Sequence, residues 1–208
     1  MTQATSAGGP VPPGNARGAR TRARLLDAAL RAFAARGFHA TGTRDIAEAA
    51  SMSPAAVYVH YRTKEELLFA LALAGHQDVQ QVVAEAARDR AEPQEQLREV
   101  TRAYTAWHAR SHTRARVVQY EMAGLSPVHA RQIARIRRDI EVRFRAIIVA
   151  GVAAGRFRVT DPKIAALAVL SLGIDVARWY REDGAWTPAE IGERYADLAL
   201  NMVGWQEL

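Results

Sequence analysis

The 208-residue chain contains no cysteine, and aromatic residues make up only 7% of it. Without a thiol it can have no disulfide scaffold, no cysteine nucleophile and no metal site that depends on thiolate ligands. Long apolar runs are also missing: the longest candidate, residues 164–174, is about half of the roughly 20 residues that cross a bilayer. Residues 1–16 lack the apolar stretch of a secretory signal peptide, which favours a cytoplasmic protein with no membrane contact.

Acidic residues are scarce in only one part of the chain. The net charge is +6, with 49% hydrophobic and 24% charged residues, which is ordinary for a globular protein. Residues 17–64 hold nine Arg or Lys and three acids, whereas the other 160 residues hold 19 of each. The whole excess therefore lies in one basic block. Such a block is typical of a surface that binds phosphate, on nucleic acid or on a membrane, although charge alone also allows a solvated basic helix with no partner.

Helix signals recur along the chain, and no alternation of β-branched residues suggests a strand. The helix starts are marked by N-cap residues followed by proline or by a capping box. The sequence therefore predicts an all-α fold of about nine helices. The expected helix starts are Ser53-Pro54, Thr63-x-x-Glu66, Ser126-Pro127, Asp161-Pro162 and Thr187-Pro188, and the helix that begins at Thr63 is expected to reach about residue 90. Another helix is expected to end at Gly37, and three more are expected to span residues 43–50, 93–110 and 113–123.

Three regions are expected: a flexible, basic-ended arm over residues 1–19, a helix-turn-helix domain over 20–66, and a helical bundle over 67–208. The bundle contains an unusual segment, because residues 164–174 carry no charge on any face. A helix that is apolar all round must be buried on all sides. Either a second subunit covers it, or it is a central helix within one chain.

Residues 43–62 have the spacing of a helix-turn-helix. One short helix has Ile46, Ala47 and Ala50 on its inner face, residues 51–53 form the turn, and Val57 faces back from the next helix. The second helix of this motif enters the major groove of DNA. We therefore expect DNA contacts from Ser53, Ala55, Ala56, Tyr58 and His60 on that helix, from Thr43 and Arg44 before it, and from a basic arm along the minor groove that includes Arg17, Arg20 and Arg22.

Residues 37–47 (GFHATGTRDIA) and 53–68 (SPAAVYVHYRTKEELL) resemble the TetR family of bacterial regulators. The resemblance implies an all-α homodimer that binds double-stranded operator DNA through its N-terminal domain and a small-molecule effector through its C-terminal domain. It also implies phosphate contacts from Tyr58 and from Lys64, whose place at a helix N-terminus favours anions. Ser51 stands where the family usually has glycine in the turn.

The C-terminal part shows no catalytic constellation, so an enzyme is not expected. His108-x-x-x-His112 has the spacing of a metal-ligand pair, but with no third ligand two surface histidines are the simpler interpretation. Neither a metal nor a cofactor is predicted. A helical-bundle enzyme would need a convergent set of acid, base or metal-binding residues that this sequence does not offer.

Aromatic and apolar side chains of the C-terminal part are candidates for an effector cavity, with plain core packing as the alternative. Residues 175–184 (DVARWYREDG) resemble a TetR subgroup that responds to acyl-CoA thioesters. Arg178 would then bind phosphate. The prediction is a ligand-responsive repressor released by an acyl-CoA, with a sensor of drugs or other hydrophobic ligands as the alternative. The candidate ligand residues are Tyr104, Trp107, Tyr120, Phe144, Ile148, Asp175, Arg178 and Trp179.

Overall fold

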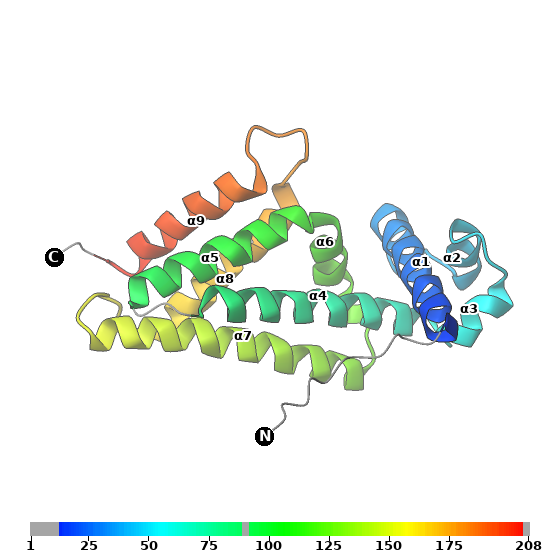
Figure 1. The fold of residues 1–208 in the computed structure, drawn as a ribbon, viewed down its shortest axis with the longest axis horizontal. Coiled ribbons are helices and arrows are strands. Elements are labelled where there is room, and N and C mark those ends of the chain that lie inside the picture. Colours follow the sequence, from blue (N-terminus) through cyan, green and yellow to red (C-terminus); the bar gives the residue numbers. More distant parts are fainter. Residues whose placement is uncertain (1–12, 89–91, 206–208) are drawn as a thin grey trace, which may run out of the picture. The chain divides into compact units, whose positions relative to one another are not determined.

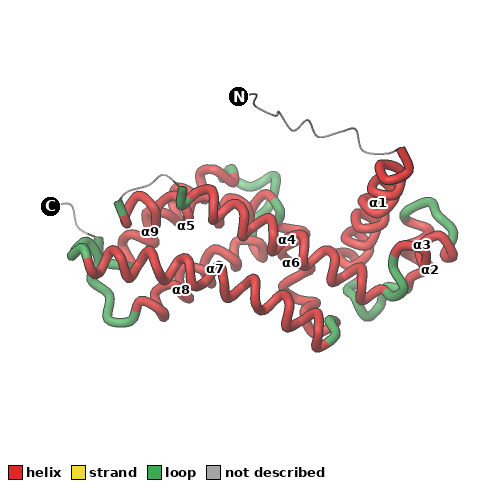
Figure 2. The backbone as a smooth tube through the Cα atoms, turned by 60° about the horizontal axis from the view of Figure 1, so that its bottom comes forward, coloured by secondary structure: helices red, strands yellow, loops and turns green. Residues whose placement is uncertain are grey.

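The computed structural model describes residues 13–88 and 92–205, and these residues form nine α-helices, one 3-10 helix and no strand (Figures 1 and 2). The all-α prediction is confirmed. The chain divides into two compact units, residues 1–67 and residues 68–208. None of the helices that the structure describes is both long enough and apolar enough to cross a membrane.

The N-terminal unit consists of α1 (Pro13–Arg36), α2 (Thr43–Ala49), α3 (Pro54–His60) and the first residues of α4 (Lys64–Ala86). Its core is made by Leu25, Phe33, Ile46 and Val57, all at most 2% exposed. The inner face predicted for the helix-turn-helix is therefore correct. Residues 13–19, expected in a flexible arm, are helical, and residues 1–12 of that arm lie outside the described residues.

The turn between α2 and α3 closes with a Schellman motif. The Met52 amide donates to the carbonyl of Ala47, and the Ser51 amide donates to that of Glu48, both at 2.9 Å. The motif needs a residue in the left-handed conformation directly after the C-cap, and Ser51 occupies that position with a φ of 52°. Only glycine adopts this conformation without strain.

We expect Ser51→Gly to raise the free energy of unfolding of the N-terminal unit by about 1 kcal/mol, because glycine relieves the strain of the left-handed conformation. The matched control is Ser53→Ala, two residues away. The Ser53 hydroxyl accepts from the Ala56 amide at 3.2 Å, so its loss should lower the same free energy by about 1 kcal/mol. Amide hydrogen exchange of residues 20–60, read by mass spectrometry, measures both changes, and protection that falls in Ser51→Gly would contradict the prediction.

The C-terminal unit holds the remainder of α4 and the helices that follow it. Its helix starts confirm the predicted caps: the side chains of Ser126, Asp161 and Thr187 each accept a hydrogen bond from a backbone amide two or three residues later. The helix α5 contacts α7, α8 and α9 (Figure 1). The elements are α5 (Pro93–Arg110), α6 (His112–Glu121), the 3-10 helix η1 (Met122–Gly124), α7 (Pro127–Ala153), α8 (Pro162–Trp179) and α9 (Pro188–Met202).

The apolar helix α8 is not buried on all sides within the chain. Ala166, Val169 and Val176 are at most 3% exposed, whereas Ile164 is 60% exposed and Leu172 is 42% exposed. A helix wholly covered by its own chain, one of the two alternatives left by the sequence, is therefore wrong. Apolar side chains on the outer face of α8 remain open to another surface.

Candidate DNA-binding surface and effector cavity

The helix α3 presents a mixed surface to solvent. Its N-terminus is capped by Ser53, and Val57 anchors its inner face in the core of the unit. On the outer face Tyr58 is 52% exposed and Val59 is 80% exposed. An exposed tyrosine hydroxyl can donate to a phosphate, and an exposed valine can contact a thymine methyl group. The geometry therefore suits a helix that lies in a groove with few base-specific hydrogen bonds.

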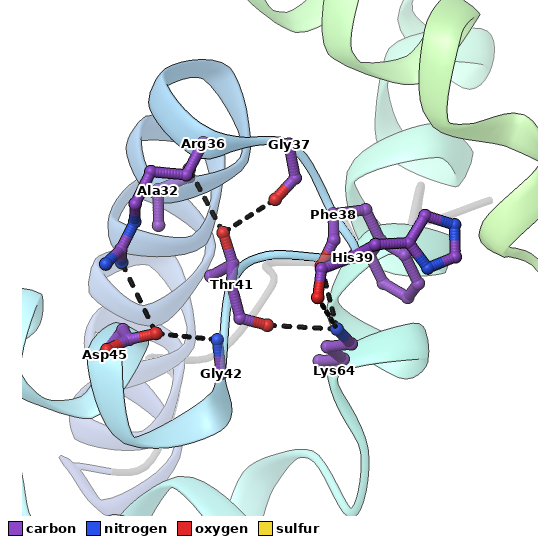
Figure 3. A network of polar contacts seen from close by, with 9 residues as sticks. All are labelled: Ala32, Arg36, Gly37, Phe38, His39, Thr41, Gly42, Asp45 and Lys64. Atoms are coloured by element: carbon purple, nitrogen blue, oxygen red, sulfur yellow. Dashed lines mark hydrogen bonds and ion pairs between the residues drawn. The ribbon is translucent and has the colours of Figure 1, made fainter.

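Lys64 is the centre of a polar network that joins α1, the following loop and α4 (Figure 3). Its ammonium donates to the carbonyls of Phe38 at 2.8 Å, Thr41 at 3.0 Å and His39 at 3.2 Å. It also lies 4.5 Å from the centre of the Phe38 ring. An ammonium has three donors, so all of them are used within the protein. Lys64 thus holds the loop after α1 in place.

Further hydrogen bonds, made by Thr41 and Asp45, fix the same loop at the end of α1 and at the start of α2. The buried Thr41 hydroxyl donates to the Gly37 carbonyl at 2.8 Å and lies 3.3 Å from the Ala32 carbonyl, at the end of α1 (Figure 3). The Asp45 carboxylate accepts from the Gly42 amide at 2.7 Å, at the start of α2. These bonds satisfy backbone groups that the ends of the two helices leave open, and they set the start of the helix-turn-helix.

The C-terminal unit contains a cavity of about 340 Å³ between α4, α5, α6, α7 and α8. Its apolar wall includes Val79, Trp107, Val118, Ile140 and Leu170. On α4, Gly75 leaves the wall without a side chain, and a Cβ built there would lie 3.4 Å from Arg114 and 3.6 Å from Trp107. The cavity is also rich in cations. It is lined by Arg114, Arg137, Arg138 and Lys163, with Glu141 as the acidic residue among its lining side chains.

A second cavity of about 250 Å³ is adjacent to the first, because Gln119, Arg137, Ser171 and Ile174 line both. Its other lining residues are largely polar or charged: Arg116, Tyr120, Asp175, Ala177 and Arg178. The Asp175 carboxylate accepts two hydrogen bonds from Arg178, at 2.7 and 2.8 Å. These bonds hold the pKa of the exposed Asp175 carboxyl below its usual value. The two cavities thus share part of their lining, and in each of them the cationic side chains outnumber the carboxylates.

Two histidines are among the polar residues that line the first cavity. Burial lowers the pKa of His76, and it lowers the pKa of His108, which is 7% exposed, to about 4. Hydrogen bonds to the backbone oppose these shifts in part, since His76 Nδ1 lies 2.8 Å from the Ala72 carbonyl and His108 Nδ1 lies 2.9 Å from that of Tyr104. Both imidazoles are therefore neutral at physiological pH.

Two domain families match the chain, one at each end, and together they span most of it. Residues 25–71 match the bacterial regulatory proteins of the tetR family, and residues 90–203 match the tetracyclin repressor-like C-terminal domain. The chain belongs to the TetR family. Its members regulate transcription through a helix-turn-helix, which agrees with the fold of the N-terminal unit.

Individual TetR-family proteins are similar over most of their length. The transcriptional repressor KstR2 of Rhodococcus jostii (strain RHA1) is 30% identical over 187 residues, which cover 86% of this chain and 89% of KstR2. A tetR-family regulatory protein from Rhodococcus RHA1 has a crystal structure with a TM-score of 0.86 and 45% identity, covering 90% of this chain and 99% of that one. AibR, solved with isovaleryl coenzyme A and operator DNA, has a TM-score of 0.77 and 26% identity, and the match covers 88% of this chain and 97% of AibR.

In this TetR-family chain, the candidate DNA-binding residues differ in their exposure to solvent. Arg44, Ser53, Ala55 and Tyr58 are exposed, while Thr43, Ala56 and His60 are half-buried. Arg20 and Arg22 are exposed but lie in α1, so the expected extended arm along the minor groove is wrong for both, because helical backbone cannot follow a groove as an arm does. Lys64, expected to contact phosphate, has its three donors bound to backbone carbonyls here, and its contact with DNA stays a prediction.

The candidate ligand residues fall into three groups. Tyr104 and Trp107 line the first cavity, and Tyr120, Asp175 and Arg178 line the second. Phe144 and Ile148 line neither of these cavities: both are 0% exposed and lie in the core, because they occupy the buried stripe of α7. Trp179 packs against the smaller core cluster that contains Val176 and Tyr180, and it lines neither cavity.

Sequence reasoning missed several residues at these sites. Val59 is the most exposed large apolar side chain of α3, and only the structure distinguishes it from its buried neighbour Val57. His108, interpreted as a surface residue, is buried, while His112 is half-buried against Tyr180 at 5.2 Å between ring centres. Among the residues that the structure describes, no group of three or more possible metal ligands forms. A signal for His108 was present, since it lies one turn after Tyr104 on the inner stripe of α5.

Proposed function

We propose that the protein is a homodimeric transcriptional repressor of the TetR family that binds a palindromic operator and is released by an acyl-CoA thioester. It would act in the cytoplasm, beside the DNA that it regulates. The observation that carries the effector assignment is the pair of adjacent cavities, which combine apolar side chains with an excess of cations. Coenzyme A esters combine an apolar acyl group with phosphates, and the two cavities offer side chains that match both parts.

The DNA-binding part of the proposal rests on the exposed face of the helix-turn-helix. Arg44, Tyr58 and Val59 stand on its solvent side, and the basic block of residues 17–64 supplies the positive charge that attracts phosphate. In a dimer, two such units about 34–36 Å apart would meet successive major grooves. Effector binding would favour a spacing that no longer matches the operator.

We expect Arg44→Ala to reduce the slope of log affinity against log salt by about one unit, because one phosphate contact is lost. The charge-matched control is Arg110→Ala, an exposed arginine of the C-terminal unit, which should leave the slope unchanged. Fluorescence anisotropy with a labelled operator, selected from random DNA, measures the slope between 50 and 200 mM salt. Equal slopes for Arg44→Ala and the parent would remove Arg44 from the interface.

The homodimer is supported by apolar side chains that the chain leaves open on its last two long helices. On α8, Ile164 is 60% exposed, and on α9, Leu198 is 48% exposed and Met202 is 39% exposed. Burying such side chains against a second copy would stabilise a dimer. Sedimentation of the parent should give the dimer mass, and Ile164→Glu with Leu198→Glu should shift it to the monomer. A parent that sediments as a monomer would contradict the proposal.

The lining of the second cavity supports a phosphate-bearing effector over a neutral drug. Its arginines outnumber its carboxylates, and the Asp175 carboxylate is already bound by Arg178. Arg137 lines both cavities, so it is placed to bind the part of a ligand that passes between them. A hydrophobic drug with no charge would offer no charged partner to Arg116 and Arg137 in the complex.

The test is a gel shift of the protein–operator complex, titrated with acyl-CoAs of rising acyl length, with coenzyme A and with the corresponding free acids. We expect release by at least one acyl-CoA at micromolar concentration and none by coenzyme A alone. Arg137→Met should weaken release by the ester, whereas Arg110→Met, outside both cavities, should not. Release by free acids or cationic dyes, without release by the esters, would reject the acyl-CoA assignment.

A further inference from the structure

The two cavity histidines have fixed tautomers. Each Nδ1 lies within hydrogen-bond distance of a carbonyl one helical turn earlier, 2.8 Å for His76 and 2.9 Å for His108. A carbonyl oxygen only accepts, so the proton of each neutral ring must be on Nδ1. Each Nε2 therefore carries a lone pair and can only accept a hydrogen bond.

These Nε2 atoms have no hydrogen-bond partner within the described parts of the chain, although both residues line the same cavity. The rings come from different helices, His76 from α4 and His108 from α5. They are also close enough that His76 contributes to the lowered pKa of His108. The cavity wall thus has two hydrogen-bond acceptors on α4 and α5, in addition to its apolar side chains and the cationic side chains of α6, α7 and α8.

Protonation does not convert these acceptors into donors near neutral pH. Burial is the main reason that both imidazoles stay neutral, and the positive charge of Arg137 further lowers the pKa of His76. A ligand carboxylate or carbonyl, which also only accepts, would face two lone pairs. At the two histidines, the wall therefore selects for a hydrogen-bond donor on the ligand.

We propose that the buried body of the effector carries a hydroxyl group that donates to Nε2 of His108 inside the cavity, with Nε2 of His76 as the second acceptor available to it. This inference rests on the proposed effector function of the cavity and specifies the class of ligand. A purely apolar acyl group would displace water from both imidazoles and return no hydrogen bond. A hydroxyl on a ring or chain returns that bond while the remainder of the body contacts Trp107, Val118 and Ile140.

The experiment compares cyclohexanecarboxyl-CoA with its 2-, 3- and 4-hydroxy derivatives, and the same four compounds as free acids. Affinity is measured by calorimetry and by tryptophan fluorescence, which reports on the C-terminal unit because all four tryptophans lie in residues 107–205. We expect at least one hydroxylated compound to bind tenfold or more tightly than its unsubstituted parent. Hydroxylated compounds that all bind no more tightly than the unsubstituted parent would overturn the inference.

Variants then identify the acceptors. His108→Phe keeps a ring of similar shape without a lone pair, and it should bring the ratio of hydroxylated to unsubstituted affinity down to about one. His76→Leu tests the second acceptor independently if His108→Phe fails to fold. The control Val118→Ala, in the apolar wall, should weaken both compounds and keep their ratio. A ratio that survives both histidine variants would overturn the assignment.

The two proposals fail in different ways. If the free hydroxy acids bind with the expected preference and the CoA esters do not, the acyl-CoA assignment is wrong and the hydroxyl recognition stands. If the esters bind and release DNA but show no preference for a hydroxyl, the acyl-CoA assignment stands and this inference is wrong.

Discussion

Replacing Lys64 by methionine is expected to lower the free energy of unfolding of the N-terminal unit by about 3 kcal/mol. The ammonium makes three charge-assisted hydrogen bonds to the backbone and lies over the Phe38 ring. Methionine keeps the apolar stem but leaves three carbonyls without their donor, two of them in partly buried bonds. Partial access of water to these carbonyls keeps the expected loss below the sum of three such bonds.

Hydrogen exchange of residues 20–60 measures this loss, because protection of α1 and α2 falls with the stability of the unit. The control is Arg62→Met, an exposed cation two residues before Lys64, which should change the protection little. Below the unfolding temperature, Lys64→Met should bind operator with the salt slope of the parent. A slope reduced by one unit, with protection unchanged, would return Lys64 to the DNA interface.

The second large effect is a loss of stability of the C-terminal unit in acid. The pKa of His108 is about 4 in the folded protein against about 6.5 for an unperturbed histidine. Between these values the unfolded chain binds a proton that the folded chain does not, so stability falls as the pH falls from about 6.5 to about 4. The integrated loss is about 3 kcal/mol. At pH 7.5 the contribution of His108 is fully present.

Urea unfolding followed by tryptophan fluorescence reads this unit alone, since the N-terminal unit has no tryptophan. His108→Gln keeps a group that can donate to the Tyr104 carbonyl and does not titrate. The difference in unfolding free energy between pH 7.5 and pH 4.5 should therefore be smaller in the variant by most of the expected 3 kcal/mol. Parallel pH profiles for parent and variant would show that another group causes the acid loss.

Local signals predicted the starts of the helices closely. Ser53, Thr63 and Thr187 each act as the caps that their sequence positions indicate, because capping depends on residues within one turn. Lys64 shows the limit of such signals. Its partners lie 23 to 26 residues earlier in the chain, so its position beside a helix N-terminus suggested an anion, while the folded chain supplies three carbonyls first.

The cavity was harder to predict than the fold. Helical periodicity tells which side chains face inward, and Phe144, Ile148, Tyr104 and Trp107 all do. Whether an inward side chain meets another side chain or an open space depends on what the facing helix carries. Tyr104 and Trp107 line the space beside Gly75, whereas Phe144 and Ile148 are wholly covered in the core, and this difference has no signature in the spacing of apolar residues.

Gly75 makes the size of the first cavity, and so of the proposed effector, adjustable at a single position. Its Cα lies on the cavity wall, and an added Cβ would meet Arg114 and Trp107 at ordinary contact distance rather than clash with backbone. Alanine, valine or leucine there would therefore shorten the space step by step and leave the helix frame intact. Regulators that descend from a common ancestor could change their inducer through this one codon, while their operator recognition, encoded in the other unit, stays the same.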